Sequence, residues 1–246
     1  MSAGWQRRAR PLLGTLVEVG VAAPGGDDAT TAELSAGLSA ALSAAFGAAF
    51  AAVAEVQACM SRFDPASDVG RFHALPAGQG CSVRPATASV LRAAAALQRE
   101  SGGLFDITKG SAPAGWRFEG RTWWRLDAAA RVDLGGIAKG YAVDRAVNAL
   151  RRHGCAGGWV NAGGDLRAFG SAELPLQLRD EVHGGVRRFG RLADGAFATS
   201  RLPGGGHVSV AAPRALWADA LTKVLAFSGD TGHPLLARHG AQGFVH

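Results

Sequence analysis

The sequence has almost no lysine, a single tyrosine and only three cysteines among its 246 residues. The cysteines, Cys59, Cys81 and Cys155, are odd in number and widely spaced, without a C-x-x-C pair. This usage argues against a disulfide framework and against a structural zinc site, and it fits a reducing compartment best. Long apolar runs are also lacking, because outside residues 30–60 no stretch reaches the roughly 18 uncharged residues of a membrane span.

The shortage of lysine is informative in itself. The lysines are Lys109, Lys139 and Lys223, so arginine carries nearly all of the positive charge. In a chain rich in alanine, glycine and arginine, codon bias converts ordinary surface lysines to arginine. A lysine then persists where a compact ammonium is needed, because a planar guanidinium does not replace it. The alternative is that three lysines are simply left over, and the sequence leaves both interpretations open.

Composition and charge limit the kinds of protein and of ligand that fit this sequence. The formal net charge of +6 favours an anionic partner. Basic residues are scattered in short pairs such as Arg7-Arg8, with no aromatic-interleaved stripe, so we expect a small anionic ligand and no nucleic acid. An apolar fraction of 48% with 19% charged residues is typical of an ordered globular chain, and we expect a single domain over residues 1–246.

Hydrophobic periodicity predicts the main elements. Residues 30–60 are alanine-rich, with large apolar residues at spacings of three and four and serines on another side. This pattern predicts a long amphipathic helix packed on a sheet, capped by Thr30 or Thr31 after a loop at 25–28, and not a transmembrane segment. Further helices are predicted at 86–100, 136–153 and 215–227. Strands are predicted at 15–21, 174–179, 189–192 and 207–212, with a strand–turn–strand over 157–170.

These elements alternate without regular βαβ order. The sequence therefore predicts an α+β fold, a layered domain with a mixed, mostly antiparallel sheet and packed helices. The glycine clusters lie in loops, and none has the spacing of a P-loop or of a dinucleotide fingerprint after a strand.

Two glycine-rich segments carry polar residues. In 132–144, Gly135-Gly136 at a helix start would let a ligand approach the backbone, and free helix N–H groups beside Lys139 suit a phosphate. An Asp-capped helix with glycines for close packing explains the same pattern. In 160–166, a glycine pair between Asn161 and Asp165 can surround a polar ligand, but it is also an ordinary hairpin turn.

Two further segments combine acidic and basic side chains. Asp106, Thr108 and Lys109 cluster after a glycine helix stop, which is a weak signal by itself. Asp219 and Lys223 lie one helical turn apart and can point at the same place. The alternative for this second pair is a surface ion pair, but apolar neighbours over residues 216–225 argue against an exposed helix face.

Together and in this order, the segments resemble the ApbE family of FAD:protein FMN transferases, in a shortened form. The resemblance covers nearly the whole chain, and the stretch at 133–144 is its most specific part. In chain order it rests on P-L-L-G-T at 11–15, M-S-R-F-D-P at 60–65, F-D-I-T at 105–108, D-L-G-G-I-A-K-G-Y-A-V-D at 133–144, N-A-G-G-D at 161–165, A-T-S at 198–200 and A-D-A-L at 218–221.

The resemblance implies an ApbE/T-fold-like enzyme that binds FAD and Mg²⁺ and moves FMN from FAD to a Ser or Thr hydroxyl of an acceptor protein, releasing AMP. The alternative is a family member that binds or slowly hydrolyses FAD without efficient transfer. The implied metal ligands are the carbonyl of Ala138, the carboxylate of Asp219 and Thr222. Implied catalytic residues are Asp219, Lys223 and His207. The implied FAD-binding residues are Met60, Ser61, Phe63, Asp106, Thr108, Lys139, Asn161, Gly163, Gly164 and Asp165.

This chain departs from the family pattern at three places. Lys223 stands where relatives have a Thr or Asp metal ligand, and an ammonium cannot coordinate a cation. Either Thr222 reaches the metal, or Lys223 takes over part of the phosphate neutralisation. After 198–200 the family continues into an H-I-I-D-P-like segment, whereas only residues 201–206 precede His207 here, which is the positional candidate for the absent histidine. Phe63 keeps an aromatic face where relatives often carry tyrosine.

The location follows from the N-terminus. Arginines precede an apolar stretch at 11–21, but Pro11, Gly14 and Glu18 interrupt it, and no lipobox or cleavage site follows. We therefore expect a cytoplasmic protein. Because relatives commonly act behind a lipoprotein leader, a leader lost from this chain would instead imply the periplasmic face of the inner membrane.

Overall fold

The structure, a computed structural model, describes residues 5–22, 32–179, 184–202 and 204–246. Its largest sheet has seven strands in the order β1-β2-β6-β7-β10-β11-β12, and every pair of neighbours is antiparallel. The α+β prediction is therefore confirmed. The strands of this sheet are β1 (Trp5–Leu12), β2 (Thr15–Ala22), β6 (Gly157–Ala162), β7 (Asp165–Gly170), β10 (Ala196–Arg201), β11 (His207–Ala212) and β12 (Gln242–Val245).

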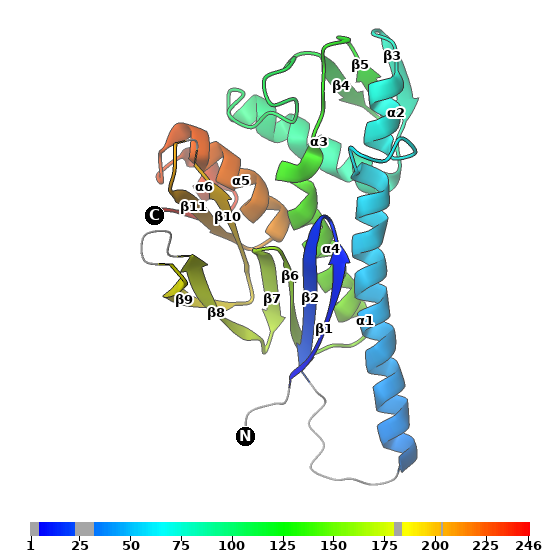
Figure 1. Ribbon diagram of the computed structural model, residues 1–246, viewed down its shortest axis with the longest axis vertical. Coiled ribbons are helices and arrows are strands. Elements are labelled where there is room, and N and C mark those ends of the chain that lie inside the picture. Colours follow the sequence, from blue (N-terminus) through cyan, green and yellow to red (C-terminus); the bar gives the residue numbers. More distant parts are fainter. Residues whose placement is uncertain (1–4, 23–31, 180–183, 203) are drawn as a thin grey trace.

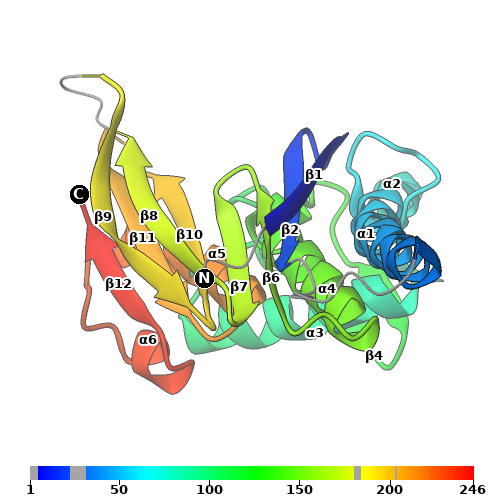
Figure 2. The same ribbon diagram turned by 90° about the horizontal axis from the view of Figure 1, so that it is seen from below.

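Helices cover one face of this sheet (Figure 2). Helix α4 packs on β6 and β7, and α5 packs on β10 and β11, so the two helices lie side by side over the middle of the sheet. The helices are α1 (Ala32–Met60), α2 (Asp68–Ala74), α3 (Pro85–Glu100), α4 (Ala138–Arg152), α5 (Ala215–Ser228) and α6 (Pro234–Arg238), with a 3-10 turn η1 at Leu134–Gly136.

Helix α1 runs along the side of the molecule and is the longest element in Figure 1. Its buried side, which includes Phe46, Phe50, Val53 and Val56, contacts α4 and β1. Within the described residues, the segment Gly37–Met60 is long and apolar enough to cross a membrane, judged by length and composition alone. About two-fifths of its most apolar 18-residue stretch is buried inside the protein. The expected cap at Thr30 or Thr31 and the loop at 25–28 lie outside the described residues.

Two smaller sheets complete the fold. Strands β3 (Gln79–Ser82), β5 (Thr122–Arg125) and β4 (Trp116–Glu119) form a three-stranded sheet beside α2. The indole of Trp123 is fully buried there and stacks on Phe72 with ring centroids 4.1 Å apart. Strands β8 (Glu173–Arg179) and β9 (Val186–Ala193) form a separate hairpin.

Helices α4 and α5 are joined by reciprocal capping. The first N–H groups of a helix have no partner inside the helix, and a carboxylate there is stabilised by the helix dipole. The buried carboxylate of Asp144 in α4 accepts hydrogen bonds from Ala215 N at 3.0 Å and Leu216 N at 3.1 Å, at the start of α5. In return, Asp219 Oδ2 in α5 accepts from Gly140 N at 3.1 Å, at the start of α4. Each helix thus fixes the start of the other.

Candidate functional site

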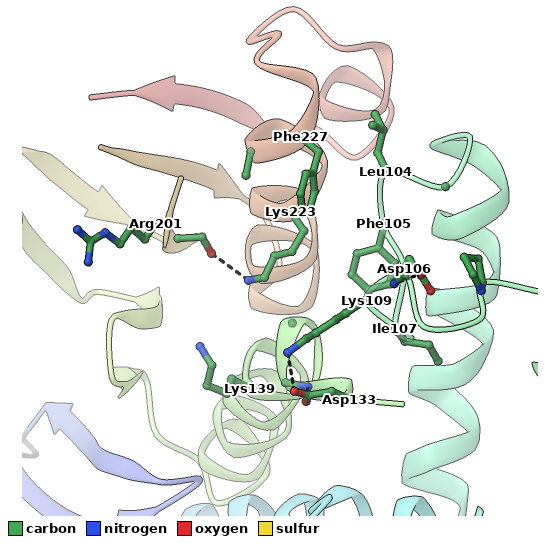
Figure 3. A pocket seen from close by; sticks show the side chains of 17 residues that line it. Leu104, Phe105, Asp106, Ile107, Lys109, Asp133, Lys139, Arg201, Lys223 and Phe227 are labelled. Carbon is green, nitrogen blue, oxygen red and sulfur yellow. Dashed lines mark hydrogen bonds and ion pairs between the residues drawn. The ribbon is translucent and has the colours of Figure 1, made fainter. Parts of the chain in front are cut away.

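A pocket of about 920 Å³ lies between the starts of α4 and η1, the side of α5 and the loop at 103–113 (Figure 3). Lys109, Lys139 and Lys223 all line it, so every lysine of the sequence lies at one pocket. This placement favours the interpretation that the lysines are retained for their chemistry. The lining comprises Gly103, Leu104, Phe105, Asp106, Ile107, Lys109, Gly110, Pro113, Asp133, Gly135, Gly136, Lys139, Ser200, Arg201, Lys223, Ala226 and Phe227.

Glycines bring the two helices close enough to build one wall. A Cβ atom at Gly140 would lie 2.1 Å from the carbonyl oxygen of Ala215, so only glycine lets α4 approach the start of α5. A Cβ at Gly136 would lie 3.1 Å from Cε of Lys223, so the stem of that lysine passes over the glycine backbone. The close-packing interpretation of these glycines therefore holds at Gly140, while Gly135 and Gly136 also face the pocket.

Lys223 is held by a cluster of oxygen atoms at the pocket wall. Its Nζ donates to Asp219 Oδ1 at 2.7 Å and to the carbonyl of Asp219 at 3.2 Å. It also lies 3.0 Å from both Ser200 Oγ and Thr222 Oγ1. The side chains of Asp219 and Thr222 are fully buried. The hydroxyl oxygens of Ser200 and Thr222 are 2.7 Å apart. The pair Asp219–Lys223 is therefore not a surface ion pair.

A second buried pair lies beside the first. The ammonium of Lys139 donates to Asp165 Oδ2, and the side chain of Asp165 is almost fully buried. Burial lowers the pKa of Lys139, but the charges of Asp219 and Asp165 outweigh burial, so this pKa lies above its ordinary value. Burial and the neighbouring charge of Asp219 raise the pKa of Asp165 to about 6, against the opposing effect of Lys139.

The turn that carries Asp165 is a two-residue hairpin loop. Gly163 and Gly164 both have positive φ, 64° and 102°, as a type I′ turn requires. Asn161 Oδ1 accepts from Gly164 N at 2.9 Å, and a Cβ at Gly163 would lie 2.5 Å from Oγ1 of Thr15. The segment is therefore a hairpin turn, as one of the two interpretations predicted. The turn places the Asp165 side chain in contact with Lys139.

The opposite wall is a loop organised by Asp106. Its carboxylate accepts from Thr108 N and Gly110 N, each at 2.8 Å, and from Thr108 Oγ1 at 2.7 Å. Lys109 at the tip has φ 50° and donates to Asp133 Oδ2 at 2.6 Å. Burial raises the pKa of Asp133, but its bonds from Lys109 and Gly135 N outweigh burial, so the pKa lies below the ordinary value. Asp106 and Thr108 thus shape the loop that presents Lys109.

The remaining lining is apolar. Leu104, Phe105 and Ile107 line the pocket from the loop side, and Ala226 and Phe227 line it from the end of α5. Phe227 is 63% exposed, so its ring is accessible at the edge of this apolar lining. The pocket therefore combines three ammonium groups with an apolar surface, which suits a ligand that has both an anionic part and an aromatic part.

Several residues expected at the site do not line this pocket. Met60 is buried at the end of α1, Ser61 Oγ accepts from Phe63 N, and the ring of Phe63 is 81% exposed beneath the guanidinium of Arg62. His207 starts β11, where its ring stacks on that of His246 with centroids 5.9 Å apart. The FAD-contact role of the first three and the catalytic role of His207 stay predictions.

Ala138, Thr222, Asn161 and the glycines of the hairpin turn are also not among the lining residues. Ala138 is the first residue of α4 and is buried, so it can reach a ligand only through its backbone. Thr222 touches the pocket through Ser200 and Lys223. The described residues contain no cluster of three or more His, Cys, Asp or Glu that could hold a metal ion.

Lys109, Asp133, Ser200 and Arg201 also line the pocket, although the family resemblance assigned a site role to none of them. The scarcity of lysine was a signal for Lys109. Asp133 and Ser200 lay inside recognised segments without an assigned role. Nothing in the sequence singled out Arg201, whose side chain extends away from the three lysines in Figure 3.

The protein is therefore an antiparallel α+β protein, and its pocket has a lining that suits a ligand with an anionic part and an apolar part. The ApbE family model matches residues 13–201, most of the chain, and the chain belongs to the ApbE family. The match ends at Arg201, so α5 with Asp219 and Lys223 lies beyond it. Comparison with curated proteins gives no match.

Solved structures extend the likeness over the whole chain. The flavin transferase ApbE from Vibrio cholerae has a TM-score of 0.80 at 17% identity, covering 99% of this chain and 94% of its own. The apo flavinyl transferase ApbE from Pseudomonas stutzeri has a TM-score of 0.77 at 20% identity, with coverages of 100% and 92%. The ApbE protein from Thermotoga maritima has a TM-score of 0.76 at 20% identity, with coverages of 98% and 94%. At these identities the likeness establishes the fold.

Proposed function

We propose that this protein is an FAD:protein FMN transferase, which moves FMN from FAD to a Ser or Thr hydroxyl of an acceptor protein. The observation that carries the proposal is the gathering of all three lysines at one pocket that also has an apolar surface. A dinucleotide of flavin and adenine offers two aromatic ring systems joined through a pyrophosphate. Membership of the ApbE family and the flavin transferase titles of similar structures support the same assignment.

In the proposed reaction, the acceptor oxygen attacks the flavin-side phosphorus of FAD. The bond from that phosphorus to the bridging oxygen breaks, AMP leaves with the electron pair, and the hydroxyl proton is released. Negative charge grows on the leaving phosphate, so fixed cations accelerate the step by neutralising that charge. Lys223 and Lys139 are suited to this role because buried carboxylates hold their ammonium groups in position. Lys109 adds a third cation from the opposite wall.

The family resemblance also implies Mg²⁺ on the carbonyl of Ala138, the carboxylate of Asp219 and Thr222. Oxygen donors of these kinds suit Mg²⁺ in general. Here, however, Asp219 Oδ1 and Thr222 Oγ1 both contact the ammonium of Lys223, and Asp219 Oδ2 contacts Gly140 N. With Lys223 in this position the residues present do not fit a magnesium ion at these atoms, and no step of the proposed reaction is assigned to one.

A second candidate function is FAD binding, or slow FAD hydrolysis, without efficient transfer. The observation that favours it is the short connection between β10 and β11, where Leu202 N donates to the Gly206 carbonyl at 2.9 Å. Residues 201–206 contain no acidic residue, so this connection provides neither the carboxylate nor the length of the H-I-I-D-P-like segment of the family. His207 follows this turn directly.

Covalent labelling separates the two candidates. The protein is mixed with FAD and a flavin-acceptor protein whose acceptor threonine is known, in parallel samples with Mg²⁺ and with EDTA. A transferase gives a fluorescent flavin band on a denaturing gel and one AMP per labelled acceptor, and the acceptor's Thr→Val variant stays unlabelled. Yellow protein that loses all its flavin on denaturation, without AMP, identifies a binding protein. AMP and FMN without a labelled band identify a hydrolase.

A further inference from the structure

The cluster around Lys223 is built as a cation site that already holds its cation. Four oxygen atoms converge on Nζ at 2.7–3.2 Å: a carboxylate oxygen and the carbonyl of Asp219, and the hydroxyls of Ser200 and Thr222. An ammonium has only three protons to donate. The cluster therefore supplies more acceptor oxygen atoms than the three ammonium protons can bond. This is expected of oxygen ligands arranged around a positive charge.

The lysine is fixed in this place from several sides. Its stem passes over Gly136, the position where an added Cβ would lie 3.1 Å from Cε. Asp219 cannot turn away to bind another ion, because its second carboxylate oxygen caps α4 through Gly140 N. The hydroxyl of Thr222 is likewise committed to the Asp219 carbonyl at 2.7 Å and to Ser200. These partners lie in α4, α5, η1 and β10, elements that pack against one another.

The charges around the cluster disfavour an additional divalent ion. Lys139 also interacts with the charge of Asp219, so two ammonium groups already surround this carboxylate and that of Asp165. A divalent ion placed among these oxygens would meet two positive charges at short range. The Lys223 side chain still has 27% of its surface exposed, and it lines the pocket, so its ammonium is available to a ligand phosphate.

We propose that the ammonium of Lys223 is the resident cation of this site and takes the place of a divalent metal in binding the pyrophosphate of FAD. This inference rests on the proposed function, because it assumes that FAD is the ligand. On phosphate binding, the longest contact of Nζ, 3.2 Å to the Asp219 carbonyl, is exchanged for a phosphate oxygen. The protein then binds FAD equally well with and without Mg²⁺, and a single substitution installs the metal requirement.

The test is calorimetric titration of FAD into the full chain, in excess EDTA and in millimolar Mg²⁺. For the unaltered protein the two dissociation constants should agree within about twofold. For Lys223→Thr, which removes the cation and adds a hydroxyl ligand, affinity in EDTA should fall by about tenfold or more, and Mg²⁺ should restore most of it. Lys109→Thr is the matched control, since it makes the same change at the same pocket, and its affinity should not depend on Mg²⁺.

The outcomes are distinguishable. FAD binding that needs Mg²⁺ in the unaltered protein overturns the inference and leaves the proposed function intact. An absence of FAD binding in both buffers overturns the proposed function itself. A Lys223→Thr protein whose weakened binding ignores Mg²⁺ contradicts the shared position of ammonium and metal. If that variant does not fold, the titration of the unaltered protein still decides, because Mg²⁺ independence is expected of it alone.

Discussion

Two of the lysine–aspartate pairs at the pocket, Asp219–Lys223 and Asp133–Lys109, lie on opposite walls and differ in burial. On the helix wall, formed by α4 and α5, the Asp219 side chain is fully buried and that of Lys223 is 27% exposed. On the loop wall, formed by residues 103–113 and Asp133, the Asp133 side chain is 18% exposed and that of Lys109 is 65% exposed. The same two residue types therefore form a fixed cation on one wall and an adjustable one on the other.

Burial decides what each pair contributes. An exposed pair is screened by water and salt and contributes at most about 1 kcal/mol to stability. A buried pair is no strong source of stability either, but removing one partner leaves an uncompensated charge, which costs about 3–5 kcal/mol. The buried carboxylate of the helix wall thus keeps Lys223 close whether or not a ligand is bound, whereas Lys109 can leave Asp133 to meet a ligand.

The largest expected effect comes from removing the buried aspartate. Asp219→Ala leaves Lys223 without its closest acceptor and uncaps Gly140 N, so the free energy of unfolding in urea should fall by about 3–5 kcal/mol. Asp133→Ala, which frees an exposed lysine and one loop N–H, should cost only about 1 kcal/mol. Equal losses in the two variants would remove the distinction between the walls.

The pH dependence of stability should have opposite signs for Asp165, the partner of Lys139, and for Asp133 on the loop wall. The pKa of Asp165 is about 6 in the folded protein, above the ordinary 3.8, so the folded state binds this proton more tightly than the unfolded chain does. Its contribution is present below about pH 4 and is lost as the pH rises towards 6, by up to about 3 kcal/mol. The pKa of Asp133 is lowered, so its contribution is present above the ordinary value and is lost as the pH falls.

Urea unfolding at a series of pH values measures this difference. In Asp165→Asn, the free energy of unfolding should decrease less between about pH 4 and 6 than in the unaltered protein. Parallel pH profiles for the two proteins would show that Asp165 is ionised with an ordinary pKa.

The contact between α4 and α5 can be tested without touching a charge. Gly140→Ala places a methyl group against the Ala215 carbonyl, so it should cost about 1–3 kcal/mol and disturb both helix starts. Gly47→Ala in α1 is the control, because a Cβ there meets nothing within 4 Å, and it should stabilise the protein by up to about 1 kcal/mol. Thermal unfolding of both variants checks the sign. A neutral Gly140→Ala would mean that the helices do not need this close approach.

FAD affinity should also depend more on Lys223 of the helix wall than on Lys109 of the loop wall, with smaller free-energy differences than those for stability. We expect Lys223→Met to lower FAD affinity by about tenfold or more, near 1.4 kcal/mol, because a fixed and partly buried ammonium is lost. Lys109→Met should lower it by about threefold or less, since an exposed charge is screened. Fluorescence titration of FAD measures both constants. A larger loss in the Lys109 variant would make the loop wall the main phosphate contact.

The sequence predicts the regular parts of the fold because their periodicity is local. Helices α3, α4 and α5 and strands β2 and β11 begin and end within about two residues of their predicted bounds. Strand β1 was not predicted, because nearly all of its residues are exposed and it therefore lacks apolar alternation. The short strands β3, β4 and β5 are defined by packing around Trp123, which no local pattern reveals.

For the site, local motifs predict which residues carry charge but not how strand register arranges them. Asp219, Lys223 and Lys139 were selected from their segments, and they do lie at or directly behind the pocket wall. His207 was selected by its position in the chain, yet its backbone pairs with Arg201 and its ring stacks on the last residue. The pairing of β11 with β10 and with β12 decides this, and the pairing of β11 with β12 depends on contacts far apart in sequence.

The most direct test of the account compares three flavins in one calorimetric experiment. If the three lysines bind the phosphates and the apolar lining binds the rings, FAD should bind more tightly than FMN, and FMN more tightly than riboflavin. Each step should be several-fold or more, because a charge-assisted phosphate contact is lost each time. One FAD should bind per chain. Equal affinities for riboflavin and FAD would contradict the assignment of the lysine-lined pocket as the site of the proposed flavin transferase.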